Sequence, residues 1–248
     1  MGLPHLISIV GAGPGDPELL TVKALNRLQN ADVILHDALI GEEMLKQAKP
    51  EAVKIYVGKL NNDGQNQLER QDGIHQLFLH WATKNKKVVR LKTGDPMIFG
   101  RGAEEIRFCK TNNLNFEVIP GVTAAVAGSS LFSVPLTERG KNNMLLFYTC
   151  RKENNCFPQL EPMVSVLQSG SPVVLYMGLH HLSELSGKLL ENGISEEMPV
   201  QILCKISQPE QSSYSTTLEK VEAFLAEKRP GTPSLVIIGE HTEKISNL

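Results

Sequence analysis

The sequence has few of the residues that build disulfide-bonded or metal-binding proteins. It contains 4 cysteines, and no two of them form a Cys-x-x-Cys pair. Its 7 histidines are scattered, and none completes the spacing of a zinc site. We therefore expect reduced, partly buried thiols and no metal site.

An excess of one charge and a long apolar run are also missing. The 25 basic and 27 acidic residues leave a formal net charge of -2, which gives no general attraction to nucleic acid or to an anionic membrane. No apolar run approaches the roughly 18 residues that a membrane span needs. The first residues, MGLPHLISIV, lack the basic region of a secretory signal peptide. We expect a cytoplasmic protein that binds neither membrane nor nucleic acid.

Apolar, strand-like runs alternate with helical patterns in the first half of the chain. The strand-like runs are residues 6–10, 33–35, 53–57, 87–91 and 116–119, and the helix-like stretches are residues 17–29, 42–48, 67–83 and 103–112. This alternation predicts an α/β fold whose sheet is mainly parallel and covered by helices on both faces.

The second half follows a stretch rich in Pro and Gly, and its strands are spaced more widely. The strand-like runs there are residues 144–148, 172–177, 199–203 and 234–238, and their interrupted pattern predicts a mixed sheet. A chain of 248 residues is long enough for two modest domains. We predict an N-terminal α/β domain over residues 1–138 and a C-terminal α/β domain over 139–248. Residues 151–162 and 205–214 are predicted to be loops.

The first motif with chemical content is GAGPGDP, over residues 11–17. It follows a predicted strand and opens a helix, which is the place of a dinucleotide-binding fingerprint. However, Asp16 replaces the third glycine of that fingerprint, and a carboxylate would repel a pyrophosphate at a helix N-terminus. Two interpretations remain. The segment is a tight turn in which Asp16 caps the helix, or it forms a pocket for a nucleoside ligand without a diphosphate.

The second motif is RLKTGDPMIFGRGAEE, over residues 90–105. It lies at the carboxyl end of a predicted strand, where open α/β sheets bind their ligands. Its three glycines allow a close backbone approach. Asp95 could accept hydrogen bonds from ligand hydroxyls, and Arg101 offers a fork for a carboxylate. The alternative is an ordinary loop, with Glu104 and Glu105 in the first turn of a helix.

Further motifs follow in order along the chain. They are His36-Asp37, Val57-Gly58-Lys59, PGVTAA over residues 120–125, PLTERG over 135–140, and Tyr176-Met177-Gly178. Together with the first two motifs, they make the sequence resemble the tetrapyrrole methylase family. The pattern GDPxIFGRGxEE is similar to the branch of that family that methylates uroporphyrinogen III.

The resemblance implies a fold, an activity and a cofactor. It implies two α/β domains with the active site between them, and a homodimer. It also implies transfer of methyl groups from S-adenosyl-L-methionine to carbons 2 and 7 of uroporphyrinogen III, giving precorrin-2. Two other functions stay open: methylation of a later corrinoid precursor, and a non-catalytic family member that binds S-adenosylmethionine.

The resemblance also implies roles for individual residues. The methyl-donor pocket is implied to be lined by Pro14, Thr93, Gly94, Asp95, Ile98, Thr123, Ala124 and Met177. Asp37 is implied to be the proton acceptor and Lys59 the proton donor. A carboxylate base suits this chemistry, because methylation of a pyrrole carbon leaves a cationic intermediate that must lose a proton. From the residues alone, Asp37 could instead cap a helix, and Lys59 could be a solvated loop lysine.

The substrate that the resemblance implies is a tetrapyrrole polycarboxylate, and the chain is nearly neutral. Local cations must therefore meet the carboxylates. Arg101 and Arg139 are our candidates, on charge and position alone. The alternative for both is a solvated surface charge.

Overall fold

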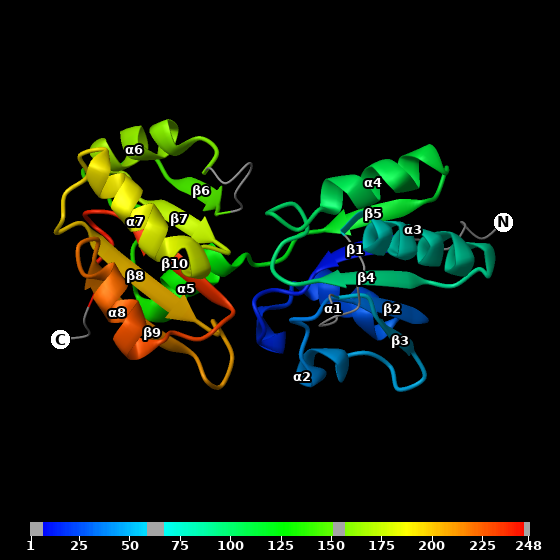
Figure 1. Cartoon of the computed structure of the whole chain (residues 1–248). Coiled ribbons are helices and arrows are strands. Elements are labelled where there is room, and N and C mark those ends of the chain that lie inside the picture. The colour runs from blue at the N-terminus through cyan, green and yellow to red at the C-terminus, as the bar shows by residue number, and fades with distance from the viewer. Residues whose placement is uncertain (1–6, 59–66, 151–156, 246–248) are drawn as a thin grey trace. The chain divides into compact units, whose positions relative to one another are not determined.

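The protein folds as two compact units (Figure 1). The structure, a computed structural model, describes residues 7–58, 67–150 and 157–245. The first unit ends at Thr123 and the second begins at Ala124. Each contains a five-stranded sheet with helices, which confirms the predicted α/β class.

The sheet of the first unit is entirely parallel. Its strands are β1 (Ile7–Gly11), β2 (Val33–His36), β3 (Val53–Tyr56), β4 (Val88–Lys92) and β5 (Phe116–Ile119), in the order β3-β2-β4-β1-β5. Its helices are η1 (Pro17–Leu19), α1 (Val22–Gln29), α2 (Glu42–Leu45), α3 (Gln67–Thr83) and α4 (Gly102–Thr111). Because all strands run the same way, their carboxyl ends and the loops that follow lie at one edge of the sheet.

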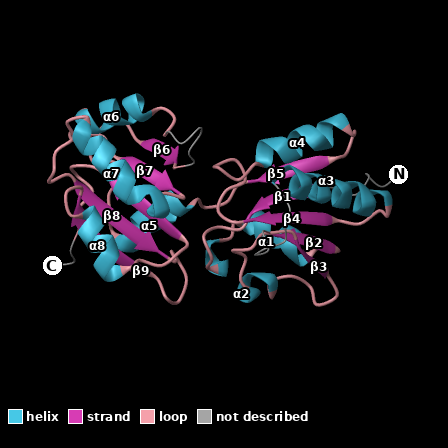
Figure 2. Ribbon diagram, viewed as in Figure 1, coloured by secondary structure: helices cyan, strands magenta, loops and turns pink. Residues whose placement is uncertain are grey.

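Helices cover both faces of this parallel sheet (Figure 2). On one face, Leu28 of α1 and Met44 of α2 join the apolar residues of the strands. On the other face, Phe78 of α3 and Cys109 of α4 do the same. Every residue of β1 is buried, as expected for a strand that is packed on both sides.

The sheet of the second unit is mixed. Its strands are β6 (Leu146–Thr149), β7 (Val173–Tyr176), β8 (Pro199–Cys204), β9 (Ser212–Thr217) and β10 (Ser234–Ile238), in the order β6-β7-β10-β8-β9. The β6–β7 pair is parallel and the other pairs are antiparallel. The helices are α5 (Ala124–Phe132), α6 (Leu160–Gln168), η2 (Leu179–His181), α7 (Leu182–Glu191) and α8 (Val221–Lys228).

The two faces of the mixed sheet are covered unequally. Met163 of α6, Leu185 of α7 and Val221 of α8 pack in one cluster with the strands. Helix α5 contacts β10 and approaches the sheet closely, since a Cβ on Gly128 would lie 2.9 Å from Leu203 Cδ1. The small residues of α5 therefore let it lie against the sheet.

The structure differs from the sequence-based expectation at three places. The units divide before α5, whereas the sequence predicted a boundary after residue 138, because α5 packs on β10 of the second unit. The predicted loop 205–214 is wrong at its end, where β9 begins at Ser212. The predicted loop 151–162 is wrong from Leu160, where α6 begins; residues 151–156 lie outside the described part.

The described cysteines are buried and unpaired. Cys109, Cys150 and Cys204 are free thiols, and burial raises the pKa of Cys109 to about 11 and that of Cys150 to about 12. These thiols are therefore protonated and unreactive near neutral pH. Cys156 lies outside the described residues.

The described residues contain neither a candidate metal-binding cluster nor a candidate membrane-spanning helix. No group of three or more His, Cys, Asp or Glu side chains in that part of the chain could hold a metal ion. Among its helices, none is both long enough and apolar enough to span a bilayer.

Candidate active site

Three loops meet through bare backbone at the carboxyl edge of the parallel sheet. They follow β1, β4 and β5, and Gly11 at the end of β1 meets Gly94 and Gly121 in the two later loops. A Cβ on Gly121 would lie 2.2 Å from the carbonyl oxygen of Gly94 and 2.7 Å from Cα of Gly11. Only glycine fits at such distances, so Gly11 and Gly121 allow the loops to cross in contact.

The loops after β1 and β4 are also joined by hydrogen bonds. Gly13 N–H donates to the carbonyl of Gly94 at 3.2 Å, and Gly94 N–H donates to the carbonyl of Gly13 at 2.8 Å. Both glycines have positive φ, +71° and +69°, which L side chains rarely adopt. Pro14 follows Gly13 and is buried. The structure thus brings together Pro14, Thr93 and Gly94.

Asp16 caps the short helix η1. Its Oδ1 accepts a hydrogen bond from the N–H of Glu18 at 2.8 Å. The interpretation of this segment as a tight turn with an Asp cap is therefore confirmed.

Asp95 ties two of these loops together. Its Oδ1 accepts from the N–H of Met97 at 2.8 Å, and its Oδ2 accepts from the N–H of Gly121 at 3.0 Å. Each carboxylate oxygen has a second lone pair, so Asp95 can still accept from a ligand. Ile98 N–H donates to the carbonyl of Asp95 at 3.3 Å, and Thr123 Cα lies 3.9 Å from the point where a Gly94 Cβ would be.

Thr93 carries a polar atom without a partner. Its Oγ1 is buried, and it has no hydrogen bond within the part of the chain that the structure describes. A buried polar atom of this kind calls for an explanation, and a ligand that supplies a donor or acceptor is one.

Asp37 stands at the same edge, at the end of β2. Its N–H donates to the carbonyl of Leu91 at 3.3 Å, its Oδ1 pairs with Arg90, and 30% of its side chain is exposed. It does not cap a helix, since the N-cap of α2 is Gly41. The helix-cap interpretation of Asp37 is therefore wrong. Lys59 lies outside the described residues.

Arg90 belongs to a buried ion network behind Asp37. Its Nε lies 3.0 Å from Glu105 Oε1, and Lys92 Nζ lies 2.9 Å from the same oxygen. Arg90 is 3% exposed, Lys92 4% and Glu105 0%. Burial lowers the pKa of Lys92 and the neighbouring Arg90 charge lowers it further. Burial also opposes the charge of Arg90, but the charges of Glu105 and Asp37 outweigh it and raise the pKa of Arg90.

Comparison with known proteins gives the family. The model of the tetrapyrrole (corrin/porphyrin) methylases matches residues 6–222. The chain belongs to this family. A uroporphyrinogen-III C-methyltransferase of a Sinorhizobium species is 38% identical over 244 residues, which are 96% of this chain and 86% of that protein.

Two further relatives differ in how much of their length is matched. A siroheme synthase of Psychrobacter cryohalolentis is 40% identical over 94% of this chain, but the chain spans only 44% of that longer protein. A uroporphyrin-III C-methyl transferase from Thermus thermophilus, solved in complex with S-adenosylhomocysteine, has 35% identity and a TM-score of 0.78. The match covers 95% of this chain and 92% of that one.

In this tetrapyrrole methylase, the two remaining donor-pocket candidates lie in the second unit. Ala124 opens α5, and Met177 directly follows β7. The N–H of Ala125 donates to Tyr176 Oη at 3.2 Å. This hydrogen bond links the segment that contains Ala124 to the segment that contains Met177. Met177 is 61% exposed and has a φ of +54°, which holds its backbone in a tight turn.

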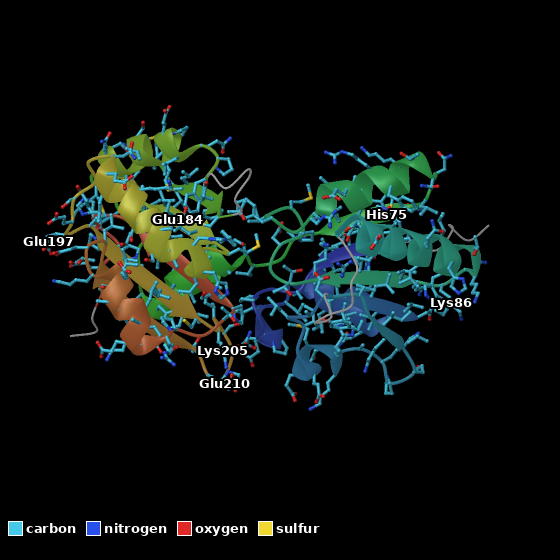
Figure 3. The ribbon with its side chains drawn as sticks, in the orientation of Figure 1. His75, Lys86, Glu184, Glu197, Lys205 and Glu210 are labelled. Carbon is cyan, nitrogen blue, oxygen red and sulfur yellow. The ribbon has the colours of Figure 1, made fainter. Side chains whose placement is uncertain are left out.

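The segment after β8 is anchored to the same helix. Ile206 is 5% exposed, and a Cβ on Gly128 of α5 would lie 3.0 Å from its Cδ1. On either side of this contact the segment is polar, and Lys205 Nζ lies 3.9 Å from Glu210 Oε2 (Figure 3). Ile206 is therefore a buried apolar residue within an otherwise polar segment.

The two candidate substrate cations have different surroundings. Arg101 makes a two-point contact with Glu104, with Nε–Oε1 at 2.8 Å and Nη2–Oε2 at 2.5 Å. Arg139 is exposed, in the segment between α5 and β6. The two arginines lie in different units.

Sequence reasoning missed the buried network of Arg90, Lys92 and Glu105. Glu105 was considered only as an acidic residue in the first turn of a helix, yet it is fully buried. The signal was present, because Arg90 and Lys92 alternate with apolar residues within an interior strand. Two cations on one face of a buried strand require a buried anion.

Proposed function

We propose that this protein transfers methyl groups from S-adenosylmethionine to carbons 2 and 7 of uroporphyrinogen III, giving precorrin-2. The observation that carries the proposal is the near full-length match to the Sinorhizobium uroporphyrinogen-III C-methyltransferase, which covers 96% of this chain and 86% of that protein. The family resemblance also supports a homodimer as the active form.

The loops after β1 and β4 are proposed to hold the methyl donor. When bound, S-adenosylmethionine supplies an activated methyl group on its sulfonium. The buried Thr93 Oγ1 and the second lone pairs of Asp95 would bind its polar atoms. Pro14, Gly94, Ile98 and Thr123 are proposed to line this part of the pocket, and the family resemblance supports Ala124 and Met177 as further donor-binding residues.

Asp37 is proposed to remove the proton that methylation makes acidic. A new carbon–carbon bond at a pyrrole carbon leaves a cation on the ring system, and loss of a proton restores neutrality. Asp37 Oδ1 is bound by Arg90, whereas Oδ2 carries no hydrogen bond from the described residues. This oxygen is the one that would accept the proton. Lys59 is proposed as the proton donor, from the family resemblance.

Arg101 and Arg139 are proposed to bind carboxylates of the substrate. The Arg101–Glu104 pair is exposed, at 35% and 40% of the two side chains. Such pairs contribute only about 0–1 kcal/mol, so a substrate carboxylate can compete with Glu104 for the guanidinium. Arg139 is exposed and can meet a carboxylate directly.

A direct assay tests the proposed function. The purified protein is incubated with S-adenosylmethionine and uroporphyrinogen III without oxygen, and the products are analysed by mass spectrometry. We expect products with one and then two added methyl groups, together with S-adenosylhomocysteine. Binding of S-adenosylhomocysteine without methyl transfer would indicate a non-catalytic member of the family. Transfer only to a later corrinoid precursor would contradict the proposed substrate.

Replacing Asp95 with alanine is expected to weaken both the fold and donor binding. Asp95→Ala removes the two hydrogen bonds to Met97 and Gly121, and hydrogen bonds to a charged group contribute about 1.5–3 kcal/mol. We expect S-adenosylhomocysteine affinity, measured by calorimetry, to fall roughly 10- to 100-fold, with a lower melting temperature. Asp72→Ala, at an exposed position on α3, is the control. Unchanged affinity in a folded Asp95→Ala protein would remove Asp95 from the donor site.

A further inference from the structure

We infer that Arg90 is a positioning residue that orients the carboxylate of Asp37 for proton transfer. The inference rests on the proposed function, because it assigns a partner to the proposed base. Arg90 touches neither substrate nor donor in this proposal. It acts by holding one oxygen of Asp37 and leaving the other available.

The geometry of the guanidinium supports this role. Arg90 Nη2 contacts Asp37 Oδ1, and Nε donates to Glu105 Oε1 at 3.0 Å. The remaining nitrogen, Nη1, donates to the carbonyls of Leu35 at 3.3 Å and Leu91 at 3.2 Å. The planar guanidinium is therefore fixed by β2, β4 and α4 at once. Its contact with Asp37 cannot shift without breaking the others.

Residue spacing explains why these side chains meet. Arg90 and Lys92 are two apart on β4, so they point to the same face of the sheet. That face packs against α4, which carries Glu105. In the register of the parallel pair, Leu35 lies opposite Arg90, and Asp37 continues β2 beyond its last residue. Arg90 therefore reaches from a buried strand to the exposed edge where Asp37 lies.

The energetic cost of the network argues against a purely structural role. Buried ion pairs are often no more stabilising than apolar residues of similar size. Val88, Val89 and Leu91 fill the neighbouring positions of β4 with buried apolar side chains. Moreover, Glu105 Oε2 is buried without a hydrogen-bond partner among the described residues, and leaving such an atom unpaired costs about 1–3 kcal/mol. An apolar strand would avoid these costs, whereas only a fixed cation can hold Asp37.

A double-mutant cycle tests the inference. Arg90→Lys keeps the positive charge, but an ammonium cannot bridge Glu105 and Asp37 as the guanidinium does. We expect kcat to fall about 10- to 100-fold, as for a misplaced catalytic group, with unchanged S-adenosylhomocysteine affinity. In the Asp37→Asn background, the same Arg90→Lys change should lower kcat less than about threefold, because the group it positions is already lost.

Two results would overturn the inference while the role of Asp37 stands. One is a kcat for Arg90→Lys equal to that of the wild type. The other is an equal loss from Arg90→Lys in both backgrounds, which indicates a structural effect independent of Asp37. If Asp37→Asn itself has wild-type kcat, the proposed base is wrong and the inference fails with it.

A second variant and a control complete the experiment. Glu105→Gln weakens the contact that holds Arg90 from the α4 side. We expect it to lower kcat in the wild-type background and to have little further effect on kcat in the Asp37→Asn background. This variant decides the question if Arg90→Lys does not fold. Arg27→Lys alters another arginine–carboxylate pair of the same unit, Arg27 with Glu117, and should leave kcat unchanged. A loss in Arg27→Lys as large as that in Arg90→Lys would refute a specific role for Arg90.

Discussion

Replacing Asp37 with asparagine is expected to lower methyl transfer by roughly 10²–10⁴, the usual contribution of a positioned acid–base group. Asparagine is nearly isosteric with aspartate and can still accept a hydrogen bond from Arg90, but its amide cannot take up a proton. The loops proposed to hold the methyl donor follow β1, β4 and β5, so S-adenosylhomocysteine affinity should stay unchanged. Single-turnover methylation of uroporphyrinogen III and calorimetric binding of S-adenosylhomocysteine measure the two effects separately.

Asp32 provides a matched control at the opposite end of the same strand. It pairs with Lys49 at 2.8 Å, its side chain is 28% exposed, and it precedes β2 rather than following it. Asp32→Asn should leave turnover unchanged. Wild-type turnover in Asp37→Asn, or an equal loss in Asp32→Asn, would contradict the assignment of Asp37 as the base.

The parallel sheet was predictable because its strands carry a strong signal. Strands of parallel sheets are rich in apolar residues, and the predicted strands over residues 33–35 and 116–119 fall within one residue of β2 and β5. The order β3-β2-β4-β1-β5 was not predictable in the same way, because it depends on pairing between residues far apart in the sequence.

The second unit was harder to predict, for two physical reasons. Strand β9 has the sequence SSYSTT and lies at the edge of its sheet. An edge strand needs little apolar surface, so it resembles a loop in the sequence. Helix α5 follows directly from the last loop of the first unit, and only its packing on β10 assigns it to the second.

The site was predictable where it depends on backbone and less so where it depends on side-chain contacts. Glycine-rich turns after strands indicated the loops around Gly13 and Gly94, since few residues tolerate such conformations. The contact of Asp95 with the N–H of Gly121 and the contact of Arg90 with Asp37 join residues 26 and 53 positions apart. No local pattern encodes such pairs, so they became visible only in three dimensions.

Replacing Gly121 with alanine is expected to disrupt the loops that carry the proposed donor pocket. The new Cβ would lie 2.2 Å from the carbonyl oxygen of Gly94 and 2.7 Å from Gly11 Cα. Both are backbone atoms, so no side chain can rotate away. We expect a loss of at least about 3 kcal/mol in the free energy of unfolding, the upper end for overpacking. This corresponds to a melting temperature lower by about 6–12 °C, with S-adenosylhomocysteine binding abolished.

Gly73 allows the same substitution without the clash. It lies within α3, and a Cβ there would meet nothing within 4 Å. Because alanine favours a helix over glycine by about 1 kcal/mol, Gly73→Ala should raise the melting temperature slightly and leave S-adenosylhomocysteine binding unchanged. The two glycine-to-alanine changes are therefore expected to shift the melting temperature in opposite directions. If Gly121→Ala binds S-adenosylhomocysteine as the wild type does, close contact among the three loops is not needed for donor binding, and the proposed pocket must lie elsewhere.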